Sequence, residues 1–592
     1  MATNKSTRDV MVIAAVTIAV VLTVMANLLA DRKFVRIDLT NEGRYSLSPE
    51  FINIVGRLED TLDITYYISQ QVPPEFANGK RDIIDKLKEI ELASRGKIKW
   101  KPIDPKDDEQ LREELQTTGG TQEVEVRSKD QRNRSLLTSS LKITYQDKPK
   151  VLTPFVGQAE QLEYLIGSKI VELTLKKKPI IALDLPAPPQ QPQMFGQQQP
   201  QQGSGYEWLQ SGQFEELKKF EVKNVDISEN NTIPSDASVL VMIRPKTLGE
   251  RQRYELVKYL AGGGKVFLIQ SGFKVSNEFG SWRNEKTPSG LEDYLKDLGI
   301  TFGTDLVCDA SNMQMPNPQS LFTQGKLEYS RYPFYVRILG ENIDQESNLT
   351  RFMPGLLMPM PSEMKVDFGE AKKAGMTARV LAKTSVQSWR VPFSENIKPN
   401  NPSLFDEATQ KFDGSMDVIV SLEGQFPFPY DGKPIPDWKK EDPANKDNNK
   451  DKAKEPDKDS KKGEMASMAK KPGALMLCSC PEAFHLMYLN NEALGSQMRT
   501  NIFLMVNIME TLGLGSDDLV KLRTKRYETR SIEKLAGKEN DVTRERIKIA
   551  LIFGVPLAIA LFALARTFFR RNAQVRYERQ FAQTIGPSSF NP

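Results

Sequence analysis

The sequence predicts an α/β protein in which two transmembrane helices, one near each end of the chain, flank exoplasmic α/β domains. Two long apolar runs, Val10–Ala30 and Ile549–Ala565, predict the spans. Between them, strand-like β-branched runs alternate with segments of helical apolar periodicity, an order that is typical of layered α/β domains. In the second domain helices separate the strands, which favours a mostly parallel, doubly wound sheet.

The first apolar run carries no charge and is long enough to cross the ~30 Å hydrocarbon core of a bilayer. The second is shorter and reaches spanning length when Phe568 and Phe569 lie in the far interface and Arg566 extends to the headgroups. We therefore expect transmembrane helices at residues 10–30 and 549–569. A cleaved signal peptide is the alternative for the first run, but the apolar stretches of such peptides are usually only ~7 to 15 residues long.

Charges around the second run set the expected orientation. From Arg566 onward the chain carries five arginines against one acid, Glu578, whereas the segment before the run mixes bases with acids. By the positive-inside rule both termini are cytoplasmic and the large domain lies outside, on the periplasmic side of a bacterial inner membrane. Residues 1–9 and 570–592 are then cytoplasmic tails.

Composition excludes several classes of function. A net charge of +4 on 592 residues leaves no nucleic-acid-binding footprint, so nucleic acid is not an expected partner. Three cysteines, Cys308, Cys478 and Cys480, cannot form a disulfide framework. The single histidine, His485, leaves almost no material for a multi-histidine zinc site or a Ser-His-Asp triad, and we expect no metal and no cofactor.

The first exoplasmic domain is expected at residues 31–178. Ser48 is a candidate N-cap, with Pro49 at the first position of a short helix. An apolar stripe that includes Ile83 and Leu87 predicts a longer helix after it. Further strands are expected at 35–39, 62–68, 97–103, 123–127 and 140–145, and further helices at 108–116 and 158–175.

The second exoplasmic domain is expected at residues 179–430, completed by residues 473–548. Its strands are expected at 180–185, 222–227, 238–243, 265–270, 302–307, 417–422 and 474–477, with a strand and turn within 376–391. Its helices are expected at 207–220, 248–261, 291–298 and 497–511, with a strand or connector at 520–527. The glycines Gly262–Gly264 precede a strand and not a helix, so they indicate a helix C-terminus and not a phosphate-binding loop.

Two segments are too polar to order themselves. Residues 186–202 consist almost entirely of Pro and Gln, and residues 431–472 are dominated by Lys, Asp, Asn and Pro. Neither can bury enough apolar surface to offset the entropy of ordering, so both are predicted to be disordered. The near-balanced charge of the second segment argues against a basic docking patch.

Cys478 and Cys480 are the best candidates for a catalytic nucleophile, because they end a predicted strand and His485 lies on the helix that should follow. A nearby histidine lowers the pKa of a thiol, and a strand-to-helix elbow holds the nucleophile of amidotransferase-like α/β folds. However, the glycines that permit such a sharp elbow are missing, and Pro481 is typical of an ordinary first helical turn. Structural thiols are therefore the preferred interpretation, and we expect no catalytic residue.

Several short stretches, together with the layout of the chain, point to a known family. The stretches are Arg36–Thr40, Tyr45–Ser48, Ile233–Pro234, Val239–Pro245 and Leu260–Val266. With the two expected spans, the large exodomain and the basic tail, they resemble the auxiliary (G) component of gliding-motility-type ABC transporters.

Two turns depart from the pattern of that family. Its members commonly carry a Gly-His-Gly-Glu-like turn after the strand that here runs to Leu185, where this chain has the Pro/Gln loop. They also carry a Gly-Asp-Ser turn after the last strand of the second domain, where this chain has Cys478-Ser479-Cys480-Pro481. If the family binds something with these turns, this chain binds it differently or not at all.

The resemblance implies a non-catalytic, membrane-anchored accessory subunit of an ABC-type transport system. The implied partners are the ABC permease and ATPase subunits, membrane lipid, and a cargo or cell-envelope component that the exoplasmic domains contact. Because no Gly-x4-Gly-Lys-Ser/Thr sequence occurs, any ATP hydrolysis belongs to a partner. Two alternatives stay open: a free-standing envelope scaffold or ligand-binding module, and a cysteine-dependent hydrolase or amidotransferase.

Overall fold

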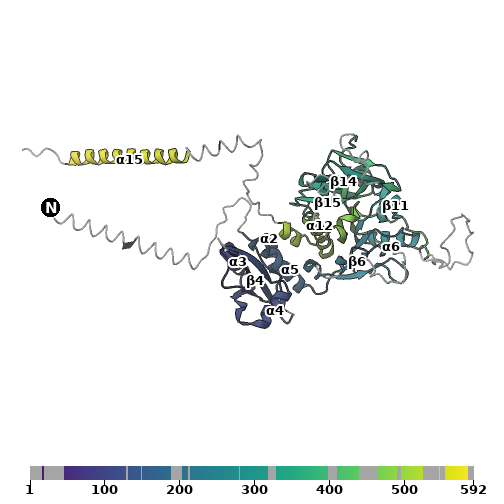
Figure 1. The fold of residues 1–592 in the computed structure, drawn as a ribbon, viewed down its shortest axis with the longest axis horizontal. Coiled ribbons are helices and arrows are strands. Elements are labelled where there is room, and N and C mark those ends of the chain that lie inside the picture. Colours follow the sequence, from purple (N-terminus) through teal and green to yellow (C-terminus); the bar gives the residue numbers. More distant parts are fainter. Residues whose placement is uncertain are drawn as a thin grey trace, which may run out of the picture. The chain divides into compact units, whose positions relative to one another are not determined.

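The computed structural model describes residues 17–18, 46–128, 131–148, 150–188, 203–210, 214–278, 281–317, 328–397, 410–438, 465–489, 495–524, 546 and 554–584. The chain divides into two compact units, Met1–Arg526 and Tyr527–Pro592. The described part of the second unit is almost entirely the helix α15 (Val555–Thr584). The first unit contains mixed α/β layers built on separate sheets (Figure 1).

The N-terminal sheet of the first unit has five strands in the order β2-β1-β4-β3, with β5 paired to β4. Its strands are β1 (Leu62–Ile68), β2 (Ile98–Ile103), β3 (Thr121–Ser128), β4 (Gln131–Tyr145) and β5 (Val151–Leu152), and its helices are α2 (Pro49–Gly56), α3 (Pro74–Ala93), α4 (Glu109–Thr117) and α5 (Leu162–Thr174). Strands β1 and β2 are parallel, and the other pairs are antiparallel. Apolar side chains of α2, α3 and α5 share one core with β1 and β4.

A buried carboxylate ties the three covering helices together. The prediction that α2 begins after Ser48 is confirmed, with Pro49 in its first turn. The Ser48 hydroxyl does not cap the helix but donates to Glu163 Oε2 of α5 at 2.5 Å. Lys86 of α3 pairs with Glu163 Oε1 at 3.0 Å. A carboxylate with partners on two other helices fixes how they pack, because breaking either contact would leave a buried charge.

The second sheet of this unit has ten strands in the order β18-β12-β16-β20-β21-β9-β8-β6-β7, with β17 paired to β20. Its strands are β6 (Ile180–Asp184), β7 (Glu221–Asn224), β8 (Ala237–Ile243), β9 (Lys265–Ile269), β12 (Ile300–Asp309), β16 (Ser362–Val366), β17 (Met376–Lys383), β18 (Ser388–Val391), β20 (Asp417–Gln425) and β21 (Pro472–Cys478). Only β7-β6-β8-β9-β21 form a parallel array. The other strands extend the sheet antiparallel, so the prediction of a mostly parallel sheet is wrong for this half.

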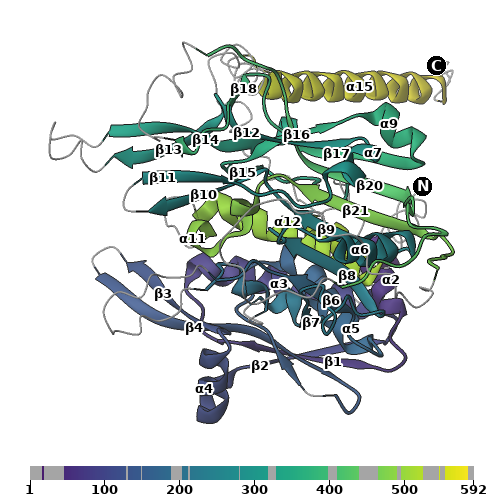
Figure 2. The same cartoon turned by 90° about the vertical axis from the view of Figure 1, so that its right-hand side faces the viewer.

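Both faces of this sheet are covered (Figure 2). Val239 and Val241 of β8 belong to one apolar core, while Leu240 and Met242 belong to the other, as the two-residue period of a strand requires. One face carries α12 (Gly495–Leu514), and the opposite face carries α6 (Glu250–Ala261), α7 (Glu292–Asp297) and α9 (Phe368–Lys373). Gly262 caps the C-terminus of α6, which confirms the prediction for the glycine run.

The described residues of the first unit also form two three-stranded sheets that the sequence did not predict. One orders its strands β10-β11-β19, and the other orders them β13-β14-β15. Their bounds are β10 (Phe273–Glu278), β11 (Ser281–Lys286), β13 (Asn312–Asn317), β14 (Glu328–Leu339), β15 (Gly355–Pro359) and β19 (Asn396–Ile397). Strand β15 packs against α12, so this addition covers part of the same face of the ten-stranded sheet.

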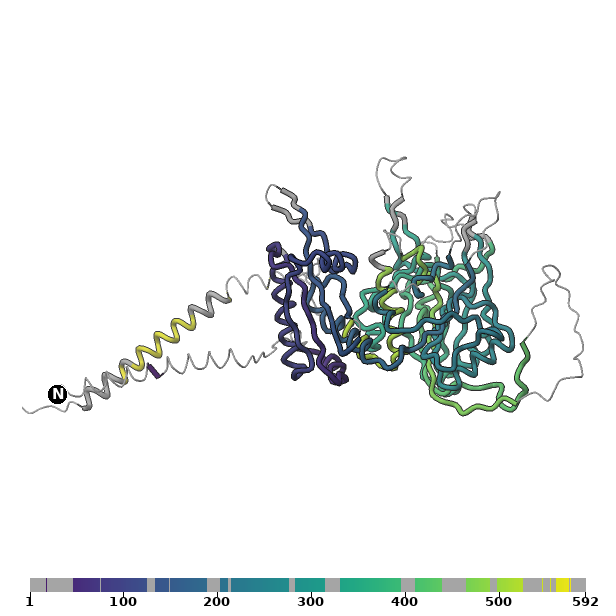
Figure 3. Tube along the Cα trace, turned by 90° about the horizontal axis from the view of Figure 1, so that it is seen from below, coloured from purple at the N-terminus to yellow at the C-terminus, as the bar shows by residue number. Residues whose placement is uncertain are grey.

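The helix α13 (Asp518–Thr524) links the two parts of the first unit (Figure 3). Leu519 and Leu522 pack into the core of the N-terminal sheet, next to α2 and α5. The prediction of a strand or connector at 520–527 is therefore wrong for its described residues. The predicted helix at 207–220 is also wrong, since its described residues form two short 3-10 turns, η3 (Glu207–Leu209) and η4 (Glu215–Leu217).

The predicted transmembrane helices at residues 10–30 and 549–569 are contradicted. Within the described ranges no helix combines the length and the apolar character that crossing a membrane requires. Helix α15 runs from Val555 through Arg566 to Thr584. The two-pass inner-membrane localisation, with cytoplasmic tails and exoplasmic domains, rested on those spans and is contradicted with them.

Some predictions fall on residues outside the described part of the chain. They are the first apolar run apart from residues 17–18, the strand at 35–39, and most of the polar segments, at 189–202 and 439–464. The predicted domain boundaries within the first unit stay a prediction.

Candidate functional site

Four parallel strands of the ten-stranded sheet end at one edge, and the residues there come from distant parts of the sequence. Asp184 ends β6, Arg244 follows β8, Gln270 follows β9, and Ser479 follows β21. We call Asp184, Arg244, Gln270 and the segment Ser479–Glu482 the carboxyl edge. The strand that follows β6 in the chain is β7, which lies on one side of β6 in the sheet. Strands β8, β9 and β21 lie on the other side of β6. In open α/β sheets, ligands bind outside the carboxyl ends at such a reversal of strand order.

An ion pair between Arg244 and Glu482 lies at the centre of the carboxyl edge. The Arg244 guanidinium donates to Glu482 Oε1, and the two side chains are 13% and 9% exposed. The backbone of Arg244 has φ of +46°, in the left-handed region that a non-glycine residue adopts at a cost. Its N–H donates to the Ile269 carbonyl at 2.9 Å, which holds that conformation in place. The surrounding structure therefore enforces the position of this guanidinium.

The ion pair is only partly satisfied. Arg244 Nε and Glu482 Oε2 are buried and have no hydrogen-bond partner among the described residues. Gln270 Oε1 and Ser479 Oγ, at the same edge, are also buried without a hydrogen-bond partner among the described residues. Four of the ten such atoms in the described residues thus belong to the carboxyl edge. Buried polar atoms are normally paired, so this concentration is typical of a place where the protein meets water or a ligand.

Aromatic residues hold the segment that carries Glu482. This segment is the 3-10 turn η6 (Pro481–Phe484), which the helix α11 (Leu486–Leu489) follows. The Tyr206 hydroxyl donates to the Pro481 carbonyl at 3.2 Å, and Trp208 Nε1 donates to the Phe484 carbonyl at 2.9 Å. Burial raises the pKa of Tyr206, so its hydroxyl stays protonated and remains a donor. The turn is fixed from the side of η3, which the sequence did not predict.

Asp184 adds a titrating group to the carboxyl edge. Burial and the neighbouring charge of Asp226 raise the pKa of its carboxyl to about 7, although Lys246 acts in the opposite direction. Such a carboxyl exchanges its proton near neutral pH. Among the described residues, however, no group of three or more His, Cys, Asp and Glu side chains is arranged to hold a metal ion.

The candidate nucleophiles are buried, and their thiols have raised pKa values. Burial raises the pKa of Cys478 to about 12 and holds the pKa of Cys480 well above its usual value. Cys480 Sγ lies 3.0 Å from the Pro359 carbonyl, and Cys308 on β12 is also buried with a raised pKa. The thiolate is the reactive form of cysteine, so none of the three is poised for attack at neutral pH.

His485 is engaged elsewhere and does not act on either thiol in the described contacts. It lies between η6 and α11, where its Nδ1 accepts from the Met487 N–H at 3.1 Å. Burial lowers its pKa, so the ring is neutral. The ring packs edge-on against Tyr206, with centroids 5.1 Å apart. A side chain at Gly205 would lie 2.0 Å from His485 Nε2, so the imidazole occupies the space that this glycine leaves.

Sequence reasoning named the thiols and His485 but missed Tyr206, Arg244 and Glu482. These three residues lie far apart in the chain and form no motif, and only the strand order brings them together. The sequence held one signal for this site. Of the two turns that depart from the family pattern, one follows β6 and the other follows β21. The structure places the ends of those strands at the same edge.

Two family models match this chain. Residues 194–467 match a family described as an ABC-type uncharacterized transport system, and residues 41–144 match a domain of unknown function (DUF7088). The first match supports an auxiliary component of an ABC-type transport system. It spans β7 to β20 and includes Arg244, whereas the second spans β1 to β3 and nearly all of β4.

A protein of Borreliella burgdorferi, described as uncharacterized, is 23% identical to this chain over 414 residues. The aligned region covers 67% of this chain and 74% of that protein. No solved structure matches.

Proposed function

We propose that this chain is a non-catalytic accessory subunit of an ABC-type transport system of the gliding-motility type. The observation that carries the proposal is the match of residues 194–467 to an ABC-type transport family. The partners are the permease and ATPase of that system, because the sequence of this chain has no Walker A loop of its own. The carboxyl edge contacts the transported cargo or a cell-envelope component.

The chemistry of the carboxyl edge supports a binding role over a catalytic one. Cys478 and Cys480 have raised pKa values, and His485 is neutral and bonded to the backbone. In contrast, Arg244 and Glu482 each keep one unpaired polar atom. One donor and one acceptor held in fixed positions suit recognition of a polar ligand group.

Co-purification tests the transport assignment. A tagged full-length chain, purified from its native cells, should bring down an ABC permease and a Walker A-containing ATPase, identified by mass spectrometry. A Cys478→Ser, Cys480→Ser, His485→Gln triple variant should associate equally well and support the same transport phenotype. If that variant stays folded and associated but loses activity, the cysteine-dependent hydrolase hypothesis is correct instead.

A single variant tests the role of the carboxyl edge. Glu482→Gln keeps the shape of the side chain but removes its charge, so it should weaken cargo recognition roughly tenfold or more while association with the permease persists. Glu346→Gln is the matched control, since the Glu346 side chain is 91% exposed and lies outside the carboxyl edge. Unchanged transport by a folded Glu482→Gln protein would remove the carboxyl edge from the mechanism.

The second candidate is a free-standing ligand-binding module. The partly satisfied Arg244–Glu482 pair is equally suited to that role, because a ligand site does not need a transporter. Absence of permease and ATPase from the purified complex, with Glu482→Gln still impairing the phenotype, would favour this alternative.

A further inference from the structure

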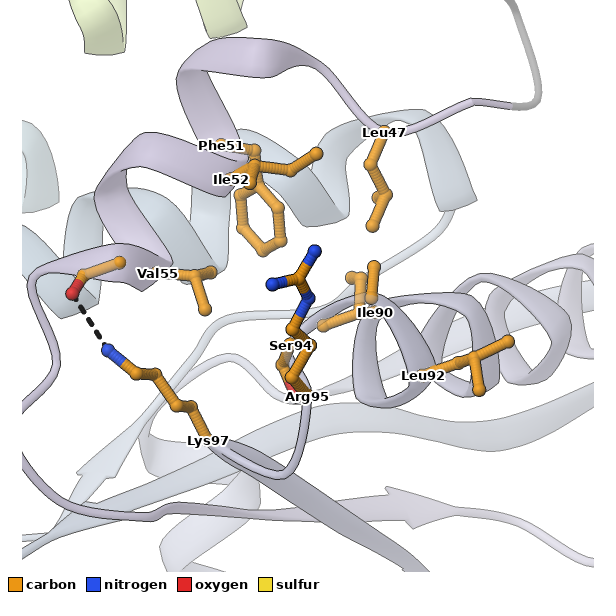
Figure 4. Close-up of a pocket in the computed structure, with 11 residues that line it drawn as sticks. Leu47, Phe51, Ile52, Val55, Ile90, Leu92, Ser94, Arg95 and Lys97 are labelled. Carbon is orange, nitrogen blue, oxygen red and sulfur yellow. Dashed lines mark hydrogen bonds between the residues drawn. The ribbon is translucent and has the colours of Figure 1, made fainter.

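A second binding feature lies in the N-terminal part of the first unit, away from the ten-stranded sheet. A hollow of about 570 Å³ opens between α2 and α3 (Figure 4). We call it the α2–α3 hollow. Its volume falls within the ~300 to 1,000 Å³ that is usual for small-molecule sites.

The walls of the α2–α3 hollow are apolar. Phe51, Val55 and Ile90 are at most 5% exposed and are fixed by the core of the N-terminal sheet. Ile52 and Leu92 also line the hollow but are 49% and 62% exposed. In this hollow, buried apolar side chains lie beside exposed ones. Covering that surface with hydrocarbon lowers the free energy, because it removes apolar area from water.

One guanidinium lies among these apolar side chains. Figure 4 shows the head of Arg95 between the side chains of α2 and Ile90. Arg95 takes part in no ion pair or side-chain hydrogen bond in the described residues. Its φ of +53° places it in the left-handed turn after α3, where the backbone directs the side chain. The α2–α3 hollow thus combines apolar walls with a cation that has no counter-charge among the residues that the structure describes.

The other cation that lines the α2–α3 hollow is already occupied. Lys97 Nζ donates to the carbonyls of Gly56 and Leu58, both at 2.8 Å, and so satisfies the C-terminal end of α2. Arg95 is therefore the single positive group in the lining that is available to a ligand. One anionic head and an aliphatic tail would complement this arrangement.

We propose that the α2–α3 hollow binds a single-chain anionic amphiphile, whose hydrocarbon packs on α2 and α3 and whose carboxylate pairs with Arg95. Burial of each CH₂ group supplies the affinity, and the guanidinium supplies selectivity for the anionic head. The inference does not depend on the transport assignment, since no residue of the carboxyl edge takes part.

Isothermal titration of the full chain with dodecanoate, below the concentration at which it self-associates, tests the proposal. Saturable one-to-one binding is expected. Dodecanol, which lacks the charge, should bind about tenfold more weakly, and decanoate, which lacks two CH₂ groups, should also lose about tenfold. Acetate, which carries the head alone, should not bind measurably. These ligand comparisons require no substitution and so do not depend on the folding of a variant.

The Arg95→Gln variant should weaken dodecanoate binding about tenfold and leave dodecanol binding unchanged. Arg81→Gln is the matched control, because Arg81 is exposed on α3 and does not line the α2–α3 hollow. Leu92→Gln should weaken both ligands, whereas Leu136→Gln, which changes an exposed leucine on β4, should weaken neither.

Three results would each overturn the proposal. The first is the absence of saturable dodecanoate binding, which would leave the α2–α3 hollow to the apolar side chains of a protein partner. The second is equal affinity for dodecanoate and dodecanol. The third is equal weakening by Arg95→Gln and Arg81→Gln, which would reduce the role of Arg95 to general surface charge.

Discussion

Glu510 and Glu482 are both buried carboxylates paired with an arginine, yet their surroundings differ. Glu510 Oε1 accepts from Lys219 and from the Tyr164 hydroxyl, and Oε2 accepts from Arg523 at 2.7 Å. Glu482 Oε1 accepts from Arg244, but Oε2 has no partner in the described residues. The first carboxylate has partners on both oxygens and the second on only one.

The location of each cluster matches this difference. The Glu510 cluster joins α5 of the N-terminal sheet to α12 and α13, and Arg523 also donates to Asn507 and lies 4.4 Å from the centre of the Tyr164 ring. The Glu482 cluster lies at the carboxyl edge of a sheet. A buried carboxylate with partners on both oxygens helps to fix how the surrounding elements pack. A buried carboxylate with one oxygen unpaired lowers stability, and such groups are common at functional sites. Buried charge alone therefore does not mark a functional site in this protein.

The largest expected effect is on the cluster whose carboxylate, Glu510, has partners on both oxygens. Glu510→Gln leaves Lys219 and Arg523 buried without the carboxylate that contacts both, and should lower the free energy of unfolding by about 3 to 5 kcal/mol. Glu482→Gln should lower it by only about 1 to 2 kcal/mol, because Arg244 is a single cation nearer the surface. Urea denaturation followed by circular dichroism measures both. Similar losses of unfolding free energy for the two variants would show that the pairing of the two carboxylate oxygens does not distinguish the two clusters.

An intermediate effect is expected from the pH response of the carboxyl edge. The folded-state pKa of Asp184, about 7, lies above its ordinary value of 3.8. Between these two values the folded state keeps a proton that the unfolded state has lost, so stability falls as pH rises through the window. Asp184→Asn removes this loss and should be more stable than the wild type by about 1 to 3 kcal/mol at pH 8, with little difference at pH 4.

Unfolding midpoints measured from pH 4 to pH 8 test this response. Asp82→Asn, which alters an exposed carboxyl on α3, should follow the wild-type curve throughout. An Asp184→Asn protein whose stability runs parallel to the wild type at every pH would show that Asp184 ionises normally in the folded state.

The smallest expected effect is the reaction of the native thiols. Cys308, Cys478 and Cys480 are fully buried with raised pKa values, so a thiol reagent at pH 8 should label none of them in the folded protein. All three should react in urea. A Thr117→Cys variant, which places a thiol at an exposed site on α4, should label at once and confirm that the reagent is active. Rapid labelling of Cys480 in the wild type would place this region nearer to a catalytic site.

Local patterns predicted the elements whose apolar period matches their burial. The strand expected at Leu62–Ile68 has those bounds, because its β-branched and aromatic residues pack on α2 and α3. The strand or connector predicted at 520–527 is wrong for its described residues, 520–524, since Leu519, Val520 and Leu522 are buried on a helix by contacts with α2 and α5. The antiparallel half of the large sheet was also missed, because its pairings join residues far apart in the chain. Strand order cannot be read from periodicity.

The candidate site was less predictable than the fold. The reactive residue types, Cys478, Cys480 and His485, were easy to find, but their reactivity depends on burial, which the sequence does not give. Arg244 lies in one of the stretches that carry the family resemblance, but nothing in the sequence links it to Glu482. The two side chains come together only because β8 and β21 end at the same edge of the sheet, with β9 between them.

The position of Arg523 near the end of the first unit has a mechanical consequence. Helix α13 ends at Thr524, and the chain passes into the second unit at Tyr527. Tension applied through that connection would reach Arg523 before any other charged residue of α13, and its bonds to Tyr164 and Glu510 would share the load between α5 and α12. A pull on the C-terminal segment would thus be resisted by helices from both parts of the first unit, because the Arg523 side chain bonds to both of them.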